Sequence, residues 1–246
     1  MSELNYHDLL ASFGIGGAHP GGFAMTREVL QEAGLTASTH LLDVGCGTGQ
    51  SAAYIAKRYG CAVTGLDRHP LMLEKAERRM RREGLAVRLV QGDAHALPFA
   101  DQTFDVVLSE SVTIFTDLNT TLQEYARVLK PNGVLLDLSM TAERPLSAQE
   151  LGELRAVYGT KIVPTEAEWC GRLQKVGFAK VDVLKKGTVA SAVPGPQATP
   201  GELPEFDPSP DIDPELFAIW ERHQALTERF SRRLGYRVYC ATRRQP

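Results

Sequence analysis

The feature that most constrains this chain is a glycine-rich turn, Asp43-Val44-Gly45-Cys46-Gly47-Thr48-Gly49, between an apolar segment and an amphipathic one. The residues HLLDV before it are typical of a buried strand, and QSAAYIAKRYG after it is typical of a helix that ends at Gly60. Alternate glycines allow the backbone to turn tightly and to approach a ligand closely. The unpaired N–H groups at the start of the following helix can meet the ligand's polar end.

Apolar strands alternate with helices from residue 40 onward. We expect strands at HLLDVG, CAVTGLD, VRLVQGD, FDVVLSE, VLLDLSM and AKVDVLKK, and a last strand at YRVYCATRR. Strands that alternate with helices predict βαβ units and an α/β fold, in which a mostly parallel sheet has both faces covered by helices. The turn at residues 43–49 would then lie at the carboxyl edge of this sheet, where such folds bind ligands.

Two segments depart from this alternation. Five glycines within residues 14–22 predict a loop, and Thr26 is expected to begin a short helix that stops near Gly34. The stretch 187–214 holds seven of the chain's fourteen prolines and predicts a long loop, which is usually a lid, a binding loop or a disordered stretch.

The domain organisation follows from these two segments. We expect residues 1–37 to form a helical cap with a glycine-rich loop, and residues 38–246 to form the main domain. Within that domain, residues 187–234 would be a lid-like loop plus a helix inserted before the last strand. Trp220 and His223 lie on one face of that helix, which we interpret as packing against the core or a second copy, with a substrate wall as the second choice.

Asp43, Asp67 and Asp93 lie at the ends of three predicted strands, and so at the predicted carboxyl edge of the sheet. A carboxylate at the end of the second strand can accept protons from both ribose hydroxyls. A dinucleotide fold would show GxGxxG, whereas here the third glycine comes one residue early. Asp43 would repel a pyrophosphate and suits a ligand with an ammonium group and no phosphate. S-adenosylmethionine fits this description.

Four ordered blocks carry a family resemblance: DVGCGTG, TGLD, GDAHALPFADQTFDVVLSE and LKPNGVLLDLS. With them the chain resembles the class I S-adenosylmethionine-dependent methyltransferases, over roughly residues 38–185 and the last strand. Among these it looks most like small-molecule enzymes related to the quinone C-methyltransferases. The resemblance implies a Rossmann-like, seven-stranded, mostly parallel sheet with an antiparallel last strand.

The resemblance also implies which residues bind S-adenosylmethionine, and hence its product S-adenosylhomocysteine: Asp43, Gly45, Gly47, Gly49, Asp67, Arg68, Asp93, Ala94 and Ser109. The glycines would pass the methionine part, Asp43 would orient the amino group, and Asp67 would hold the ribose. Arg68, Asp93 and the Ala94 N–H would surround the adenine, and Ser109 would face the methyl group or the substrate. We nominate His19, in the glycine-rich loop, and Glu110 as catalytic residues; the alternative for His19 is that it only pins the loop.

Composition and charge disfavour several classes of binding partner. The net charge is −3, so binding to nucleic acid through total charge is disfavoured. The chain has no apolar run long enough for a membrane span, no signal-peptide pattern, and four scattered cysteines without metal-ligand spacing. We therefore expect a reduced, cytoplasmic protein that binds no metal and acts on a small molecule, with a homodimer left open.

Other functions stay open at this stage. An RNA or protein methyltransferase, or a module that binds S-adenosylmethionine without catalysis, would share the cofactor motifs. A nicotinamide dehydrogenase is disfavoured by the glycine spacing. The sequence leaves open the identity of the acceptor and whether its attacking atom is O, N, S or C.

Overall fold

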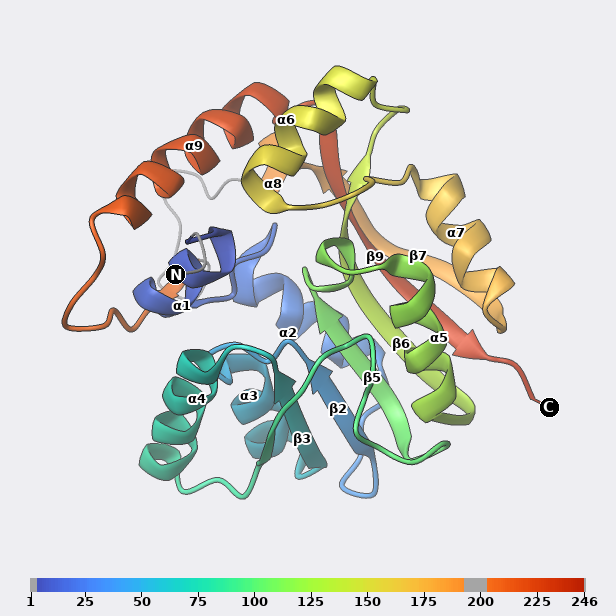
Figure 1. The fold of residues 1–246 in the computed structure, drawn as a ribbon. Coiled ribbons are helices and arrows are strands. Elements are labelled where there is room, and N and C mark those ends of the chain that lie inside the picture. The colour runs from blue at the N-terminus through green and yellow to red at the C-terminus, as the bar shows by residue number, and fades with distance from the viewer. Residues whose placement is uncertain (1–3, 193–202, 246) are drawn as a thin grey trace.

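A seven-stranded sheet in the order β4-β3-β2-β5-β6-β9-β7 forms the centre of the molecule (Figure 1). The computed structural model describes residues 4–192 and 203–245. Its strands are β2 (His40–Val44), β3 (Ala62–Asp67), β4 (Arg88–Gln91), β5 (Phe104–Glu110), β6 (Leu129–Ala142), β7 (Phe178–Thr188) and β9 (Leu234–Arg243). Strands β2 to β6 run parallel to one another, and β9 is antiparallel to both β6 and β7. The predicted α/β, Rossmann-like sheet with an antiparallel last strand is confirmed.

Helices cover both faces of this sheet. They are α2 (Gly22–Glu32), α3 (Gln50–Tyr59), α4 (Pro70–Glu83), α5 (Leu118–Val128) and α7 (Glu166–Lys175), while α6 (Ala148–Tyr158) packs against α9 (Glu215–Phe230). Alternate residues of β2 show why both faces are needed, because Leu42 and Val44 belong to one buried cluster and Leu41 to the other. The first cluster includes residues of α5, α6 and α7, and the second includes residues of α2 and α3.

Local sequence signals set the ends of several helices. Helix α4 begins with Pro70 at its first turn, and α3 and α4 end at Gly60 and Gly84, both in the left-handed conformation. Helix α2 begins at Gly22, four residues earlier than the predicted start at Thr26. Because Gly21 has φ +80° and caps the helix, the glycine cluster turns the chain into the helix rather than remaining a loop throughout.

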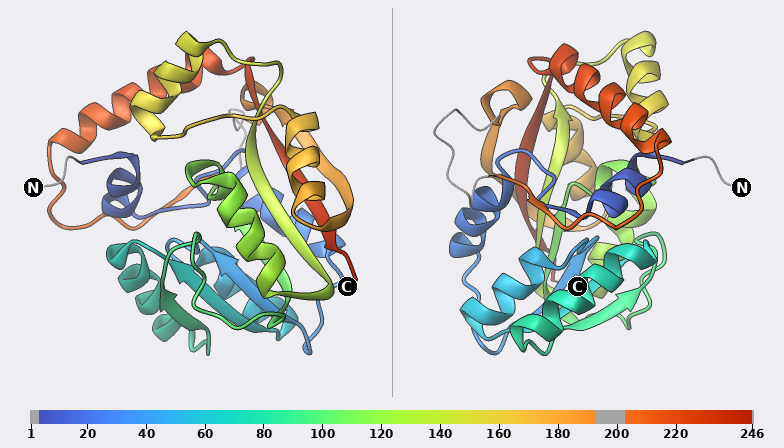
Figure 2. Two further views of the ribbon diagram at one scale, coloured as in Figure 1. Left: turned by 45° about the vertical axis from the view of Figure 1, so that its right-hand side comes forward. Right: turned by 90° about the vertical axis from the view of Figure 1, so that its left-hand side faces the viewer.

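The first and last parts of the chain meet over the carboxyl edge of the sheet. Helix α1 (Tyr6–Phe13) packs against α9 (Glu215–Phe230), and both lie over the same end of the sheet (Figure 2). The short strand β1 (Ile15–Gly16) pairs antiparallel with β8 (Glu205–Phe206). The prediction of loop throughout residues 14–22 was therefore wrong at β1, because pairing with a partner about 190 residues away leaves no local pattern.

Residues 203–210, which we call the strap, are tied to two elements at once. On one side the N–H groups of Asp207 and Ser209 donate to Gly14 O (3.0 Å) and Ser12 O (2.8 Å). On the other side α4 contributes an ion pair from Arg78 to Asp207 (3.0 Å), and also Lys75 Nζ to Asp207 O and Arg79 to Glu205. Of the predicted loop 187–214, residues 193–202 lie outside the described residues, and α8 (Val189–Ala192) follows β7 directly.

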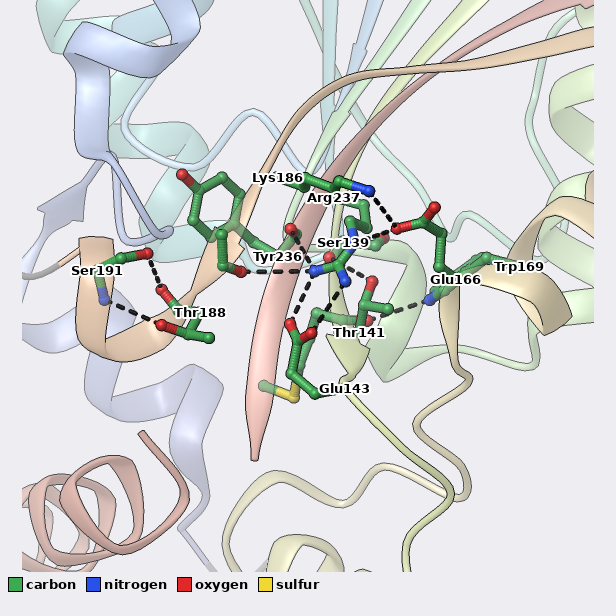
Figure 3. A network of polar contacts seen from close by, with 12 residues as sticks. Ser139, Thr141, Glu143, Glu166, Trp169, Lys186, Thr188, Ser191, Tyr236 and Arg237 are labelled. Atoms are coloured by element: carbon green, nitrogen blue, oxygen red, sulfur yellow. Dashed lines mark hydrogen bonds and ion pairs between the residues drawn. The ribbon is translucent and has the colours of Figure 1, made fainter. Parts of the chain in front are cut away.

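The buried side chain of Arg237 links β9 to the end of β6 and to α7 (Figure 3). Arg237 of β9 donates to both carboxylate oxygens of Glu143 (2.8 and 3.1 Å) and from Nε to Glu166 (2.6 Å). These contacts raise the pKa of Arg237 and connect β9, the end of β6 and the start of α7. Within residues 4–192 and 203–245, none of the helices has both the length and the apolar character required to cross a bilayer.

Candidate active site

A cavity of about 510 Å³ lies at the carboxyl edge of the sheet, under α1, α9 and the strap. Its floor is made of residues at the carboxyl ends of β2, β3 and β5, including Asp43, Gly45, Asp67 and Glu110. Its far wall comes from α1, the 3₁₀ helix η1 (Thr113–Phe115), α6 and α9. Pro204 and Phe206 of the strap also line the cavity, so segments from the first and last parts of the chain together cover it.

Asp43 is a buried carboxylate with an unsatisfied oxygen. The residue is 2% exposed, and its Oδ2 has no hydrogen-bond partner within the part of the chain that the structure describes. Burial raises the pKa of Asp43 well above its usual range, and the nearby charges of Glu110 and Asp67 raise it further. A buried polar atom without a partner is costly, so this oxygen fits a ligand with a hydrogen-bond donor, above all a cationic one.

The glycine-rich turn places its backbone against the cavity. The N–H groups of Gly45 and Cys46 both donate to Leu66 O, at 2.7 and 3.0 Å. Gly45 has φ +69°, and a Cβ there would lie 2.2 Å from Cγ2 of Val112, so a side chain is excluded. Gly47 lines the cavity, whereas Gly49 packs against α4, where a Cβ would meet Met80 at 2.8 Å. The structure therefore brings Gly45 and Gly47, but not Gly49, to the cavity.

Asp67 is held by two backbone donors. Gly47 N donates to its Oδ2 (2.9 Å) and His69 N donates to its Oδ1 (2.8 Å). Each carboxylate oxygen can accept a second hydrogen bond, so both can still bind ligand hydroxyls. Burial raises the pKa of Asp67, and the two backbone hydrogen bonds oppose that shift.

Three further predicted residues lie at the same end of the cavity: Arg68, Asp93 and Ala94. Asp93 Oδ1 accepts from His95 N (2.8 Å) and lies 2.6 Å from His95 Nδ1. Although partial burial raises the pKa of Asp93, the hydrogen bonds from His95 lower it overall. Ser109 is placed differently, since its side chain is fully buried beside Thr113 (2.9 Å) and does not line the cavity.

The two residues nominated for catalysis contact each other. His19 Nε2 lies 3.3 Å from Glu110 Oε1, and the two side chains are 3% and 11% exposed. Glu110 also accepts from Thr26 Oγ1 and Ser51 Oγ, each at 2.5 Å. His19 Nε2 lies 3.2 Å from Thr26 Oγ1, and its Nδ1 lies 3.3 Å from Pro20 O. Both ring nitrogens therefore already have protein partners, which favours a role in pinning the loop.

An aromatic wall in the other half of the cavity was not predicted as a site. Its rings come from four elements: Tyr6, His7, Phe115, Tyr158, Trp220 and His223. These residues are far apart in sequence, and only the Trp220–His223 face of α9 gave a signal, which we ranked as packing first. Among the described residues, no three His, Cys, Asp or Glu side chains are arranged to hold a metal ion.

Comparison with known proteins places this geometry in a family. A family model described as a methyltransferase domain matches residues 41–133. The uncharacterized methyltransferase YodH of Bacillus subtilis is 37% identical over 242 residues, which are 96% of this chain and 98% of that protein. The chain belongs to the class I S-adenosylmethionine-dependent methyltransferases.

Other relatives of this methyltransferase match parts of the chain or its fold. The demethylmenaquinone methyltransferase of Tropheryma whipplei is 43% identical over 105 residues, 42% of each chain. A phosphoethanolamine N-methyltransferase of Haemonchus contortus, solved with S-adenosylhomocysteine, has a TM-score of 0.74 at 18% identity. This chain covers 57% of that protein, and 97% of this chain is matched. The cyclase SpnF has a TM-score of 0.70 at 21% identity, covering 95% of this chain and 88% of its own.

The residues of this methyltransferase fit the cofactor of its family. S-adenosylmethionine has an ammonium group, a ribose and a sulfonium, and no phosphate. The unsatisfied Asp43 Oδ2, the two accepting oxygens of Asp67 and the close backbone at Gly45 and Gly47 match those groups in chemistry.

Proposed function

We propose that this methyltransferase transfers a methyl group from S-adenosylmethionine to a small organic acceptor by in-line displacement. The observation that carries the proposal is the cavity itself, which has acidic groups and bare backbone at one end and an aromatic wall at the other. The cofactor supplies an electrophilic methyl carbon on a positive sulfur. The protein then has to position the acceptor and exclude water.

The cofactor end of the cavity is assigned as follows in this proposal. Asp43 holds the amino group, Gly45 and Gly47 lie along the methionine part, and Asp67 binds the ribose hydroxyls. Arg68, Asp93 and the Ala94 N–H surround the adenine. Gly49 and Ser109 support the site indirectly, since Gly49 packs α3 on α4 and Ser109 hydrogen-bonds to Thr113 of η1.

His19 and Glu110 remain the nominated catalytic pair, needed only if the acceptor carries a proton at the working pH. Their contacts also support a positioning role, because Glu110 joins β5, α2 and α3 through Thr26 and Ser51. The variants Glu110→Gln and His19→Asn separate the two roles. Loss of the acid limb in the pH profile of kcat, where a general base becomes protonated, supports catalysis, whereas an unchanged profile with a raised KM supports positioning.

The deciding experiment uses S-adenosylmethionine labelled in the methyl carbon. Purified protein is incubated with small-molecule extracts, with total RNA, and with proteins from a lysate, and the labelled product is identified by mass spectrometry. A labelled small molecule supports the proposal. Label in RNA or protein would establish the alternative substrates, and cofactor binding without transfer in every pool would indicate a non-catalytic module.

A further inference from the structure

We propose that the acceptor is an uncharged, largely apolar aromatic compound bearing a hydroxyl, and that His223 hydrogen-bonds that hydroxyl. This inference rests on the proposed function and concerns only the acceptor half of the same cavity. It is carried by the ring wall, by the charges that line the cavity and by the Tyr158–His223 pair.

The ring wall is continuous across α1, η1, α6 and α9. Tyr6 lies 5.0 Å from the rings of both Tyr158 and His223, measured between ring centroids, and 6.1 Å from Phe115. Trp220 lies 6.1 Å from His223. The Tyr6–Tyr158 contact is edge-to-face and the others are tilted, at separations that aromatic groups prefer, so a planar apolar ligand can extend the cluster.

Cations that could hold an acidic acceptor are confined to the cofactor end. Arg68 is the one Lys or Arg among the described residues that line the cavity. The residues outside the description, 1–3, 193–202 and 246, contain no Lys or Arg in the sequence. Arg237 and Arg79 lie near the cavity, but the former is bonded to Glu143 and Glu166 and the latter to Glu205. A phosphate or carboxylate would therefore be buried without a counter-ion.

The histidines of the wall do not supply that charge. Burial, together with the positive charge of Arg68, lowers the pKa of His7 to about 4. Burial also lowers the pKa of His223. Groups on the facing elements are neutral too, since Tyr6 and Tyr158 have raised pKa values caused first by burial. The wall is thus uncharged near neutral pH.

A cationic amine also lacks a partner in this half. Among the lining carboxylates, Glu110 is already engaged, because its two oxygens accept from Thr26 and Ser51 and contact His19. The other lining acids are at the cofactor end: Asp43 and Asp67 lie in the last residues of β2 and β3, and Asp93 comes just after β4. An uncharged acceptor is the class that the remaining surface can bury without penalty.

The polar feature of the wall is suited to a hydroxyl. Tyr158 Oη lies 2.9 Å from His223 Nδ1 and 3.5 Å from Thr227 Oγ1. Within residues 4–192 and 203–245, His223 Nε2 makes no hydrogen bond, although His223 lines the cavity. The free nitrogen is a donor in one tautomer and an acceptor in the other, and a hydroxyl can satisfy both.

The test measures binding to the full chain saturated with S-adenosylhomocysteine. Three probes share one ring system: 2-naphthol, 2-naphthoate and naphthalene. Affinity for S-adenosylhomocysteine is measured first by calorimetry; its absence would contradict the proposed function without bearing on the acceptor class. With the cofactor product bound, we expect 2-naphthol to bind at least 10-fold more tightly than 2-naphthoate at pH 7.

Two variants connect the preference to the named residues. His223→Phe keeps an aromatic ring and should weaken 2-naphthol binding about 5- to 10-fold while leaving naphthalene affinity unchanged, since a neutral hydrogen bond is lost. Thr227→Arg adds a cation to the wall, one turn after His223, and should raise naphthoate affinity toward that of naphthol. Thermal unfolding confirms that each variant is folded. Naphthoate binding to the unmodified protein as tightly as naphthol, or no binding of any probe, would overturn the inference.

Discussion

At the scale of single residues, the site depends on carboxylates that are buried where water cannot stabilise their charge. Asp43 and Asp67 are 2% and 9% exposed, and burial raises the pKa of both. Such groups lower the stability of the folded protein, so a ligand that pairs with them is bound more strongly than it would be at an exposed site.

Replacement of Asp67 by alanine should weaken binding of S-adenosylmethionine by about 1.5–3 kcal/mol, the value typical of hydrogen bonds to a charged group. Asp67→Asn, which keeps one accepting oxygen, should lose less. Calorimetry measures both, with Asp101→Ala as the control because Asp101 pairs with Arg127 and does not line the cavity. Unchanged affinity in the alanine variant would remove Asp67 from the ribose site.

Asp43→Asn should stabilise the protein at pH 7 in the absence of ligands. The raised pKa means that ionisation of Asp43 destabilises the folded state, so the penalty is absent below the unfolded carboxyl pKa of about 4 and grows as pH rises above it. The gain in the variant should therefore vanish as pH falls below about 4. Thermal unfolding across pH reports it, at about 2–4 °C for each kcal/mol. A variant that is less stable than the parent at pH 7 contradicts this account.

Single residues also mark the limits of sequence reasoning. The position of the acids and of Gly45 and Gly47 at the cavity could be predicted because the turn is a local sequence pattern, while their roles toward the cofactor stay a prediction. The aromatic wall was not, since Tyr6, Phe115 and Tyr158 come from separate elements and each one looks like an ordinary core residue. Ser109 is the opposite case. Its place in the motif predicted a position at the cofactor, but its side chain is buried in the core.

At the scale of elements, the strap is the part of the fold that the sequence described least well. Hydrophobic patterning predicted α3 and the central strands, because each of them buries apolar residues in the sheet core. The pairing of β1 with β8 depends on contacts between the two ends of the chain, and two-residue strands have no periodicity to detect. The division into a cap of residues 1–37 and a lid within 187–234 remains our proposal.

Gly14 and Gly34 offer a matched test of the strap. Both have left-handed φ values near +60° beside a helix end, but a Cβ on Gly14 would lie 2.2 Å from Asp207 O, whereas Gly34 has nothing within 4 Å. Both alanine variants should lose about 1 kcal/mol in unfolding free energy from backbone strain. Gly14→Ala alone should also speed dissociation of S-adenosylhomocysteine, measured by stopped-flow. Equal dissociation rates in the two variants would show that the strap does not retain the ligand.

At the scale of the whole molecule, the cavity is closed by segments that lie at opposite ends of the sequence. Saturation with S-adenosylhomocysteine at 100 times its Kd should raise the unfolding free energy by about 2.7 kcal/mol. Hydrogen exchange should slow most in the strap and α1, because these segments lie over the cavity, and should change little in β6. Uniform slowing throughout the chain would indicate global stabilisation without a closing cover. Whether two copies associate stays a prediction for sedimentation analysis.

The position of β9 affects how the chain can fold during synthesis. This strand lies between β6 and β7, which are both synthesised before it. The edges of β6 and β7 that face β9 can therefore pair only after residues 234–243 have been made. Until the ribosome has translated that segment, β6 and β7 leave unpaired backbone groups open to intermolecular pairing. Nascent chains stalled before residue 234 should therefore depend on chaperones, while the half built from β2 to β5 can form first.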